Sequence, residues 1–157
     1  MADPTPPSGP TLEQLTQYAA LFTRTVTLKH YGLRINFPSV DRVEVLLDSV
    51  QPEHRGGLGT SAVNGGVLAA IFDLAIGCTP ALMDPTRRSA TMHLSMNFER
   101  PVLGDSVRAE AWIDSAGSST IFAGAQIYDA QGQVCARCQG VAKIARIPWE
   151  GGTPAQQ

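Results

Sequence analysis

Asp73 is the residue whose type and position point most directly to chemistry. It lies near the middle of a stretch, residues 65–83, that contains no other charged side chain, and such a stretch predicts a buried helix. Burying an unpaired carboxylate costs free energy, so we expect Asp73 to have a partner, to be protonated, or to face a cavity that a ligand and water enter. The structural alternative is that Asp73 only accepts hydrogen bonds from backbone groups inside the core.

The start of the same helix offers a site for negative charge. Asn64, Gly65 and Gly66 fall in its first turn, where backbone N–H groups lack acceptors within the helix and the helix dipole favours an anion. These N–H groups could therefore bind the oxyanion that forms when a carbonyl group is attacked. Asp73 also shares one side of the helix with several small residues, which indicates that another element approaches closely. The small residues are Gly66, either Ala69 or Ala70, and Gly77.

The elements that position these residues can be predicted from the spacing of apolar side chains. A segment that starts at Thr11 has apolar residues three to four apart and predicts a short helix, and two alternating segments, 33–37 and 43–47, predict two strands. The glycine-rich loop 51–60 then leads into the long helix. We expect four further strands, which show the same alternation: 88–98, 106–114, 119–128 and 134–147.

The long helix has its own boundary signals. Thr60 or Ser61 is a candidate N-cap, and the helix should end between Pro80 and Pro85. Because the helix is apolar on nearly every side, it must be enclosed rather than laid on a surface. The order of the elements therefore predicts an α+β protein, in which a curved antiparallel sheet of about six strands wraps around this helix and a short helix precedes it.

The chain of 157 residues has the length of one domain. Its start is rich in proline and polar, so we expect a disordered arm over 1–10, a single domain over 11–147 and a flexible tail over 148–157. The formal net charge of −2 at pH 7 gives no basic surface for nucleic acid. The start shows no signal-peptide pattern and Asp73 argues against a membrane span, so we expect a cytoplasmic protein that binds neither nucleic acid nor membrane.

The cysteines predict neither a disulfide framework nor a metal site. Cys78, Cys135 and Cys138 are an odd number in a chain without a secretion signal, which fits reduced thiols. Cys135 and Cys138 form a C-x-x-C motif, but they lie in an alternating strand, where an odd separation places the two side chains on opposite faces. The three histidines are scattered along the sequence and form no metal triad.

The segment from Val63 to Asp73 resembles the start of the central helix in the hotdog-fold acyl-CoA thioesterases. The resemblance runs over about residues 51–145 and is greatest to the branch of the phenylacetate-pathway thioesterase, within the 4-hydroxybenzoyl-CoA thioesterase superfamily. In that family His-Gly-Gly opens the helix, and an acidic residue follows eight positions after the first glycine, as Asp73 follows Gly65 here. The resemblance implies a hotdog fold, a Gly65 N–H that polarises the thioester carbonyl, and Asp73 as a general base or a nucleophile.

Other positions acquire expected roles from the same resemblance. Thr91 aligns with a hydroxyl residue that positions water, and Ser95 is the alternative on the same strand face. His54 resembles the histidine that opens the loop before the helix and is expected near the substrate. Asn64 replaces the usual histidine, and its amide can bind a carbonyl oxygen but cannot transfer a proton. The remaining substrate contacts are expected from Gly66, Phe72, Ile76 and Met83.

The implied reaction is hydrolysis of an acyl-CoA, with an aryl or medium-length acyl group, to the free acid and CoA. Coenzyme A is part of the substrate, and no other cofactor and no metal ion are expected. Basic side chains could hold its phosphates or be ordinary surface charges: Arg87, Arg88, Arg100, Arg137, Lys143 and Arg146. A lone hotdog subunit exposes a sheet edge and half of a site, so a homodimer or homotetramer is implied, with Asp73 and Thr91 meeting across subunits.

Two other functions remain open. A non-catalytic acyl-CoA binding module would keep the pocket and lack the proton transfer that Asn64 removes. A hotdog hydratase or dehydratase would need a histidine paired with an acid at the active helix, and residues 65–83 contain no histidine.

Overall fold

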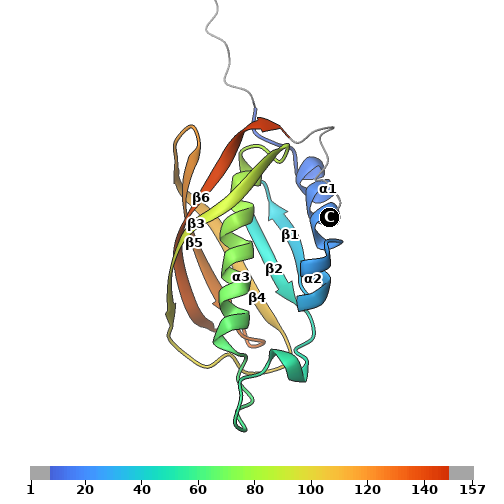
Figure 1. Ribbon diagram of the computed structural model, residues 1–157, viewed down its shortest axis with the longest axis vertical. Coiled ribbons are helices and arrows are strands. Elements are labelled where there is room, and N and C mark those ends of the chain that lie inside the picture. Colours follow the sequence, from blue (N-terminus) through green and yellow to red (C-terminus); the bar gives the residue numbers. More distant parts are fainter. Residues whose placement is uncertain (1–7, 149–157) are drawn as a thin grey trace, which may run out of the picture.

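The computed structural model describes residues 8–148, which form one six-stranded antiparallel sheet curved around a long helix (Figure 1). The predicted hotdog architecture of the α+β class is therefore confirmed. Most of the expected N-terminal arm and C-terminal tail lies outside the described residues. Within them, residues 8–10 have no regular secondary structure.

The elements follow one another with short connections, and the sheet order is β1-β2-β4-β5-β6-β3, so β1 and β3 are the edges. The helices are α1 (Leu12–Thr23), α2 (Val26–Tyr31) and α3 (Gly65–Cys78), with a 3₁₀ turn before α3, η1 (Pro52–His54), and another directly after it, η2 (Thr79–Leu82). The strands are β1 (Arg34–Ser39), β2 (Arg42–Leu47), β3 (Arg87–Phe98), β4 (Val107–Ala116), β5 (Thr120–Tyr128) and β6 (Val134–Pro148).

Local signals explain where the N-terminal helices begin and end. The Thr11 hydroxyl accepts a hydrogen bond from the N–H of Gln14 at 3.2 Å, and the Gln14 side chain accepts one from the N–H of Thr11 at 2.9 Å, a capping box that starts α1. We did not predict α2, because its six residues are too few to show a helical period. It ends at Gly32, whose φ of +70° favours glycine. α1 packs against β1, where the rings of Tyr18 and Phe37 lie 6.0 Å apart.

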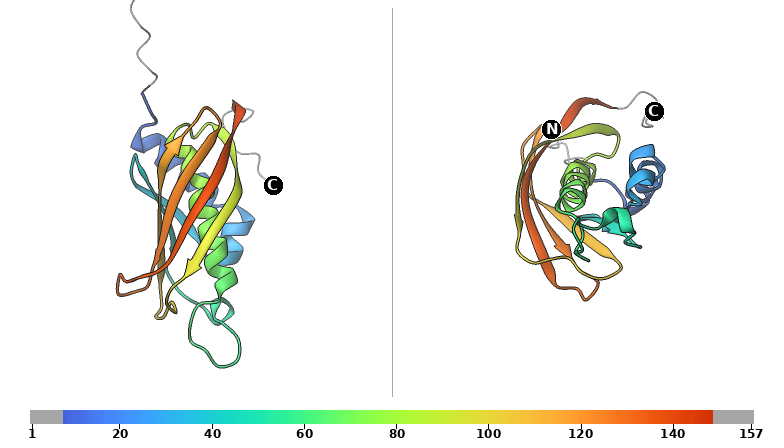
Figure 2. Two further views of the ribbon diagram at one scale, coloured as in Figure 1. Left: turned by 90° about the vertical axis from the view of Figure 1, so that its left-hand side faces the viewer. Right: turned by 60° about the horizontal axis from the view of Figure 1, so that its bottom comes forward.

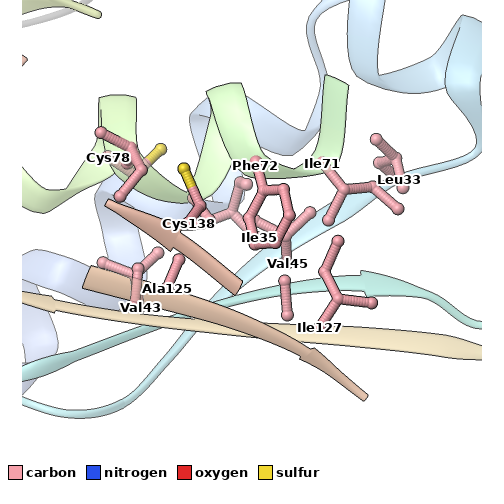
Figure 3. Packing of buried hydrophobic residues seen from close by; sticks show 14 of the residues in the cluster. Leu33, Ile35, Val43, Val45, Ile71, Phe72, Cys78, Ala125, Ile127 and Cys138 are labelled. Carbon is pink, nitrogen blue, oxygen red and sulfur yellow. The ribbon is translucent and has the colours of Figure 1, made fainter. Parts of the chain in front are cut away.

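α3 lies in the concave side of the sheet, with α1 and α2 beside it (Figure 2). Ile71, Phe72 and Ile76 of α3 are fully buried. Figure 3 shows Ile71 and Phe72 facing apolar side chains from three strands of the sheet, which belong to the same buried cluster. These sheet residues are Ile35, Val45 and Ile127.

α3 is not enclosed on every side, contrary to our expectation. Asp73 is exposed, and so are Asn64, Gly65 and Gly66 at the start of the helix. The reason is that β3 ends the sheet, so no further strand covers the side of α3 beyond it. The stretch Gly65–Leu82 is long and apolar enough to cross a membrane, but 61% of it is buried inside the protein, as in the core helix of a folded domain.

A β-bulge in β3 changes which side chains face α3. Thr91 pairs with Ala142 of β6, whereas His93 pairs with Val141, the residue next to Ala142. Two steps along β3 therefore match one step along β6, and Met92 is the extra residue. The alternation of inward and outward side chains shifts by one residue at this point.

The shift separates two residues that we expected on one face. Before the bulge, Thr91 faces α3 and its hydroxyl contacts the carbonyl group of Asp73. After the bulge, Leu94 and Met96 pack against the core, while Ser95 lines a hollow on the outer face of the sheet. The prediction that Ser95 shares a strand face with Thr91 is therefore wrong.

A second β-bulge interrupts the C-x-x-C segment of β6. Ile127 of β5 pairs with Ala136, but Tyr128 pairs with Val134, so Cys135 is the extra residue. The regular alternation on which our prediction for this motif rested does not hold at Cys135, and both cysteines of the motif are buried. Both are free thiols, as is the third cysteine of the chain.

Candidate active site

Asn64 is the N-cap of α3. Its backbone is extended, with φ −61° and ψ 137°, and its side-chain oxygen accepts a hydrogen bond from the N–H of Gly66 at 2.7 Å. We expected Thr60 or Ser61 to cap this helix, and that prediction is wrong: the Thr60 hydroxyl instead accepts a hydrogen bond from the N–H of Ala62 at 3.1 Å, within the loop. Asparagine is among the strongest N-cap residues, and Asn64 directly precedes the first helical residue.

The N–H of Gly65 is open to a ligand. It has no acceptor within residues 8–148, Gly65 is exposed, and a Cβ atom placed on it would have no heavy atom within 4 Å. The N–H of Gly66 is occupied by Asn64 and is therefore not a free donor, although we expected Gly66 to contact substrate. The side-chain NH₂ group of the exposed Asn64 has no acceptor in the same residues. Gly65 and Asn64 thus offer free donors at this end of the helix.

Asp73 carries a carboxylate that is free to act. The residue is exposed, and its carboxylate forms no hydrogen bond and no ion pair with residues 8–148. We expected a buried carboxylate, and that expectation is wrong, because Asp73 lies on the exposed side of α3. Asp73 follows Gly65 by eight residues, which is about 12 Å along a helix axis. A carbonyl group bound to the N–H of Gly65 is therefore out of reach of the carboxylate on the same helix.

Two hydroxyl groups of β3 join this strand to α3. Thr91 donates a hydrogen bond to the carbonyl oxygen of Asp73 at 3.3 Å, and Ser89 donates one to that of Gly77 at 2.8 Å. The missing side chain of Gly77 makes room for Thr91, because the Thr91 hydroxyl would lie 2.9 Å from a Cβ atom there. This is the close approach that the small residues predict. Thr91 lies beside Asp73 of its own chain, so the expectation that the two meet across subunits is corrected.

His54 is buried and uses both ring nitrogens inside the protein. Nδ1 accepts a hydrogen bond from the N–H of Gln51 at 2.9 Å. Nε2 lies 2.8 Å from the carbonyl oxygen of Tyr31, so this nitrogen carries the proton and donates it. The ring leaves no polar atom free for a substrate. We therefore correct the predicted substrate contact: His54 belongs to the framework of the loop before α3.

The apolar residues that we expected around the acyl group divide into two kinds. Phe72 and Ile76 have no exposed surface, and Ile76 packs so closely on Gly140 that a Cβ atom there would lie 2.7 Å from it. Both serve the core, and the prediction that they line an acyl pocket is wrong for this structure. Met83, at the end of η2, is 40% exposed and stays a predicted contact.

The cysteines do not support thiol chemistry at this site. Burial raises the pKa of Cys78 to about 12 and that of Cys138 to about 11. Burial also raises the pKa of Cys135. The thiolate is the reactive form of cysteine, so these groups stay protonated and unreactive near neutral pH. Residues 8–148 hold no group of three or more His, Cys, Asp or Glu side chains that could bind a metal ion.

Some of the basic residues that could bind CoA phosphates are already in ion pairs within the protein. Arg87 forms an ion pair with Asp84, and Arg137 forms one with Glu99, each at 3.0 Å. Arg100 is exposed and has no ion-pair partner within residues 8–148. A contact between CoA phosphates and these side chains stays a prediction.

Two groups contribute to the site that we did not predict from the sequence. Ser89 was not singled out, although it alternates with Thr91 on the part of the strand before the bulge and so shares its face. The carbonyl of Tyr31, which holds the ring of His54, is a backbone atom and has no signal in the sequence.

Comparisons with known proteins show which proteins share this fold and this part of the sequence. The family model described as the thioesterase superfamily matches residues 61–136, from the end of the loop through α3 and β3 into β6. The matched residues and the fold make this chain similar to the thioesterase superfamily. No curated protein matches the chain.

Solved structures from bacteria share the fold along most of the chain. The PaaI protein of the E. coli phenylacetic acid degradation operon has a TM-score of 0.76 and 19% sequence identity, over 88% of this chain and 99% of PaaI. A protein from Shewanella oneidensis related to the thioesterase superfamily has a TM-score of 0.76 and 22% identity, over 85% of this chain and 96% of its own. A thioesterase from Haemophilus influenzae has a TM-score of 0.71 and 20% identity, over 88% and 92%. Likeness at this level of identity concerns the fold.

Proposed function

We propose that this protein is an acyl-CoA thioesterase, in which the N–H of Gly65 binds the thioester oxygen and Asp73 of a second protomer acts at the carbonyl carbon. The observation that carries the proposal is that the amide of Gly65 and the carboxylate of Asp73, on the same helix, both have no partner within residues 8–148. Acyl transfer needs both parts, a donor for the developing oxyanion and a group that delivers the attacking oxygen. The match of residues 61–136 to the thioesterase superfamily model supports this proposal.

Two protomers are needed because the two groups lie far apart on one helix. The contacts of Thr91 with Asp73 and of Ser89 with Gly77 make α3 run antiparallel to β3. Gly65 lies about 12 Å from Asp73 along the helix, which corresponds to about four residues along the strand. The start of α3 therefore lies beside Ser95 of β3, whereas Asp73 lies beside Thr91. The midpoint between these two positions along β3 is close to the bulge.

The free edge of β3 can supply the second protomer. β3 is the longer of the two edge strands, with 12 residues against six in β1. A long unpaired edge readily pairs with an identical strand, and antiparallel pairing of two β3 strands creates a twofold axis. With the axis near His93, Asp73 of one protomer comes to the α3 start of the other. A homodimer with two composite sites follows, and two such dimers would give a homotetramer.

The chemistry then has two routes, which share the same oxyanion donor. In the general-base route, Asp73 takes a proton from water while the water oxygen attacks the carbonyl carbon, the C–S bond breaks, and the departing CoA thiolate takes up the proton. In the nucleophilic route, the carboxylate attacks the carbonyl carbon, CoA leaves, and water hydrolyses the mixed anhydride. Thr91 is the residue expected to hold water beside Asp73. Coenzyme A takes part only as a portion of the substrate.

Thiol release from a panel of short, medium, long and aryl acyl-CoA substrates tests the proposal, with Asp73→Asn beside the wild type. We expect saturable turnover of at least one class, with aryl or medium-chain substrates first, and a kcat lower by about 10²- to 10⁴-fold in the variant. Glu13→Gln removes the same charge from another exposed carboxylate, in α1, and should leave kcat unchanged.

The same experiment separates the alternative function. Asn64 caps the helix and cannot transfer a proton, which is the observation in favour of a non-catalytic acyl-CoA binding module. Saturable binding with equal and negligible turnover in the wild type and Asp73→Asn would rule out the hydrolase and support the binding module.

A further inference from the structure

We propose that His54 is a positioning residue for the oxyanion-binding amide of Gly65. This inference rests on the proposed function. His54 touches neither the substrate nor the reacting atoms in our proposal, and it acts by holding the base of the loop that leads into α3.

The polar groups of His54 join three segments of the chain. The ring donates a hydrogen bond to the carbonyl oxygen of Tyr31 at the end of α2, at 2.8 Å, and accepts one from the N–H of Gln51 at 2.9 Å. The backbone N–H of His54 donates to the carbonyl oxygen of Gln51 at 3.0 Å. Its backbone carbonyl accepts a hydrogen bond from the N–H of Asn64 at 2.8 Å. The residue that caps α3 is therefore bonded directly to His54.

Further bonds make the base of this loop a small ladder. Arg55 and Val63 form a β-bridge, and the N–H of Gly56 donates to the carbonyl oxygen of Ala62 at 2.8 Å. The hydrogen bond between His54 and Asn64 is the one nearest the helix. Because each of these bonds joins one side of the loop to the other, the position of Asn64 depends on that of His54.

The base of the loop has further attachments. On the side of Asn64, the N–H of Val63 donates to the carbonyl oxygen of Val102 at 2.9 Å. On the side of His54, the Arg55 side chain donates to the carbonyl oxygen of Gly104 at 3.3 Å. Removal of the imidazole of His54 leaves these bonds in place and breaks only the contacts of the ring with Tyr31 and Gln51. The fold should survive, while Asn64 and the amide that follows it shift.

Such a shift would lower the rate of the chemical step and leave the affinity for substrate nearly unchanged. Asn64 accepts the hydrogen bond from Gly66 and precedes Gly65, so its movement changes the direction of the open N–H. A misplacement of about 1 Å in a catalytic group can lower the rate by about 10²-fold. The loss should fall on kcat, because an oxyanion donor acts chiefly in the transition state.

Two amide variants separate the two ring nitrogens. Glutamine places its NH₂ group about as far from the backbone as Nε2 of histidine, so His54→Gln can keep the bond to Tyr31. Asparagine reaches only as far as Nδ1, so His54→Asn can accept from Gln51 but loses Tyr31. We expect His54→Asn to lose about 10- to 100-fold in kcat, with KM within about threefold of the wild type. His54→Gln should retain kcat within about threefold.

Hydrogen exchange of the Gly66 amide gives a readout that does not depend on turnover. This N–H is bonded to the Asn64 side chain, so its exchange should be faster in His54→Asn and unchanged in His54→Gln. Thr79→Val is the control, because it removes a buried hydrogen bond to Ile76 at the far end of α3. It should lower the melting temperature and leave both kcat and Gly66 exchange as in the wild type.

The outcomes are decisive in each direction. A folded His54→Asn with wild-type kcat and wild-type Gly66 exchange overturns the proposal, and so do equal losses in His54→Asn and His54→Gln. If His54→Asn does not fold, Gln51→Pro takes its place, which removes the N–H bonded to Nδ1 and also the side-chain bond to Ser49. Gln51→Ala removes the bond to Ser49 alone and is its control. Faster Gly66 exchange in Gln51→Pro than in Gln51→Ala is expected, and equal exchange overturns the proposal. If the wild type shows no turnover, the proposed function fails, while Gly66 exchange still decides whether His54 sets the helix start.

Discussion

Replacing Gly65 with proline should remove one hydrogen-bond donor without disturbing α3. Gly65 is the first residue of the helix, and proline is favoured there because this N–H has no acceptor within the helix. The preceding Asn64 already has the extended backbone, φ −61° and ψ 137°, that proline requires of its neighbour. The space beside Gly65 is empty, with no heavy atom within 4 Å of a Cβ placed there.

The expected effect on activity is the loss of one oxyanion donor. Removal of such a donor lowers kcat by about 10²- to 10³-fold, or about 2.7–4 kcal/mol of transition-state stabilisation. Stability should change in the opposite direction, because proline in a compatible backbone restricts the unfolded chain and stabilises the fold by about 0.4–1 kcal/mol. Gly65→Ala is the matched control, since alanine occupies the same empty space and keeps the N–H. We expect its kcat within about threefold of the wild type.

The assay is steady-state hydrolysis of the best acyl-CoA substrate, with thermal unfolding of each variant. Gly65→Pro should melt at or above the wild-type temperature and show a low kcat with a nearly unchanged KM. If Gly65→Pro and Gly65→Ala hydrolyse the thioester at the same rate, the open amide is not the oxyanion donor. The inference from the helix start to catalysis would then be wrong.

Three further predictions follow from the same structure. Mixing protomers that carry Asp73→Asn with protomers that carry Gly65→Pro should restore about one quarter of wild-type activity. Half of the random dimers are mixed, and each mixed dimer has one intact site out of two. If each site were formed by one protomer alone, mixing would restore no activity. Burial raises the pKa of Cys78 from 9.0 to about 12, so above pH 9 the unfolded chain loses this proton before the folded chain does. The urea concentration at the midpoint of unfolding should therefore fall as the pH rises from 9 towards 12. The fall with pH should be shallower in Cys78→Ala, and an equal fall in the variant and the wild type would contradict burial of Cys78 as the cause. Phe72→Ala should lower the free energy of unfolding by about 3–5 kcal/mol, because the ring is fully buried. Urea denaturation measures this loss, and a loss below about 1 kcal/mol would show that the ring is not part of the core.

The sequence predicts the sheet well because alternation and turn residues are local signals. All six strands were expected, and their observed bounds differ from the expected ones by a few residues. The bulges at Met92 and Cys135 were not expected, since an extra residue in one strand is defined only by its pairing with the neighbouring strand. For this reason Ser95 was assigned to the wrong face of β3.

The site is predicted less completely, because its residues were assigned by position rather than by contact. The spacing of Gly65 and Asp73 led to two groups that are exposed and unpaired within the described residues. The same reasoning placed His54 near the substrate, although both of its ring nitrogens bond to backbone groups. It also placed Phe72 in a pocket, although its side of the helix faces the sheet. Composition identifies a helix as apolar, but only packing decides which side is core.

The distance between Gly65 and Asp73 links the proposed chemistry to assembly. Residues four apart on a helix are neighbours on one face, about 6 Å apart, and with that spacing a donor and a carboxylate could act on one carbonyl within a single protomer. A separation of eight residues corresponds to about 12 Å, which is too long for one thioester group. The same separation suits two sites related by a twofold axis, each with a donor from one chain and a carboxylate from the other. Because the edge strand β3 lies beside α3, pairing of two such strands would supply this axis without any additional element. In the proposed mechanism the spacing in the sequence therefore constrains the quaternary structure, and for this reason defects at the two positions should complement each other between chains.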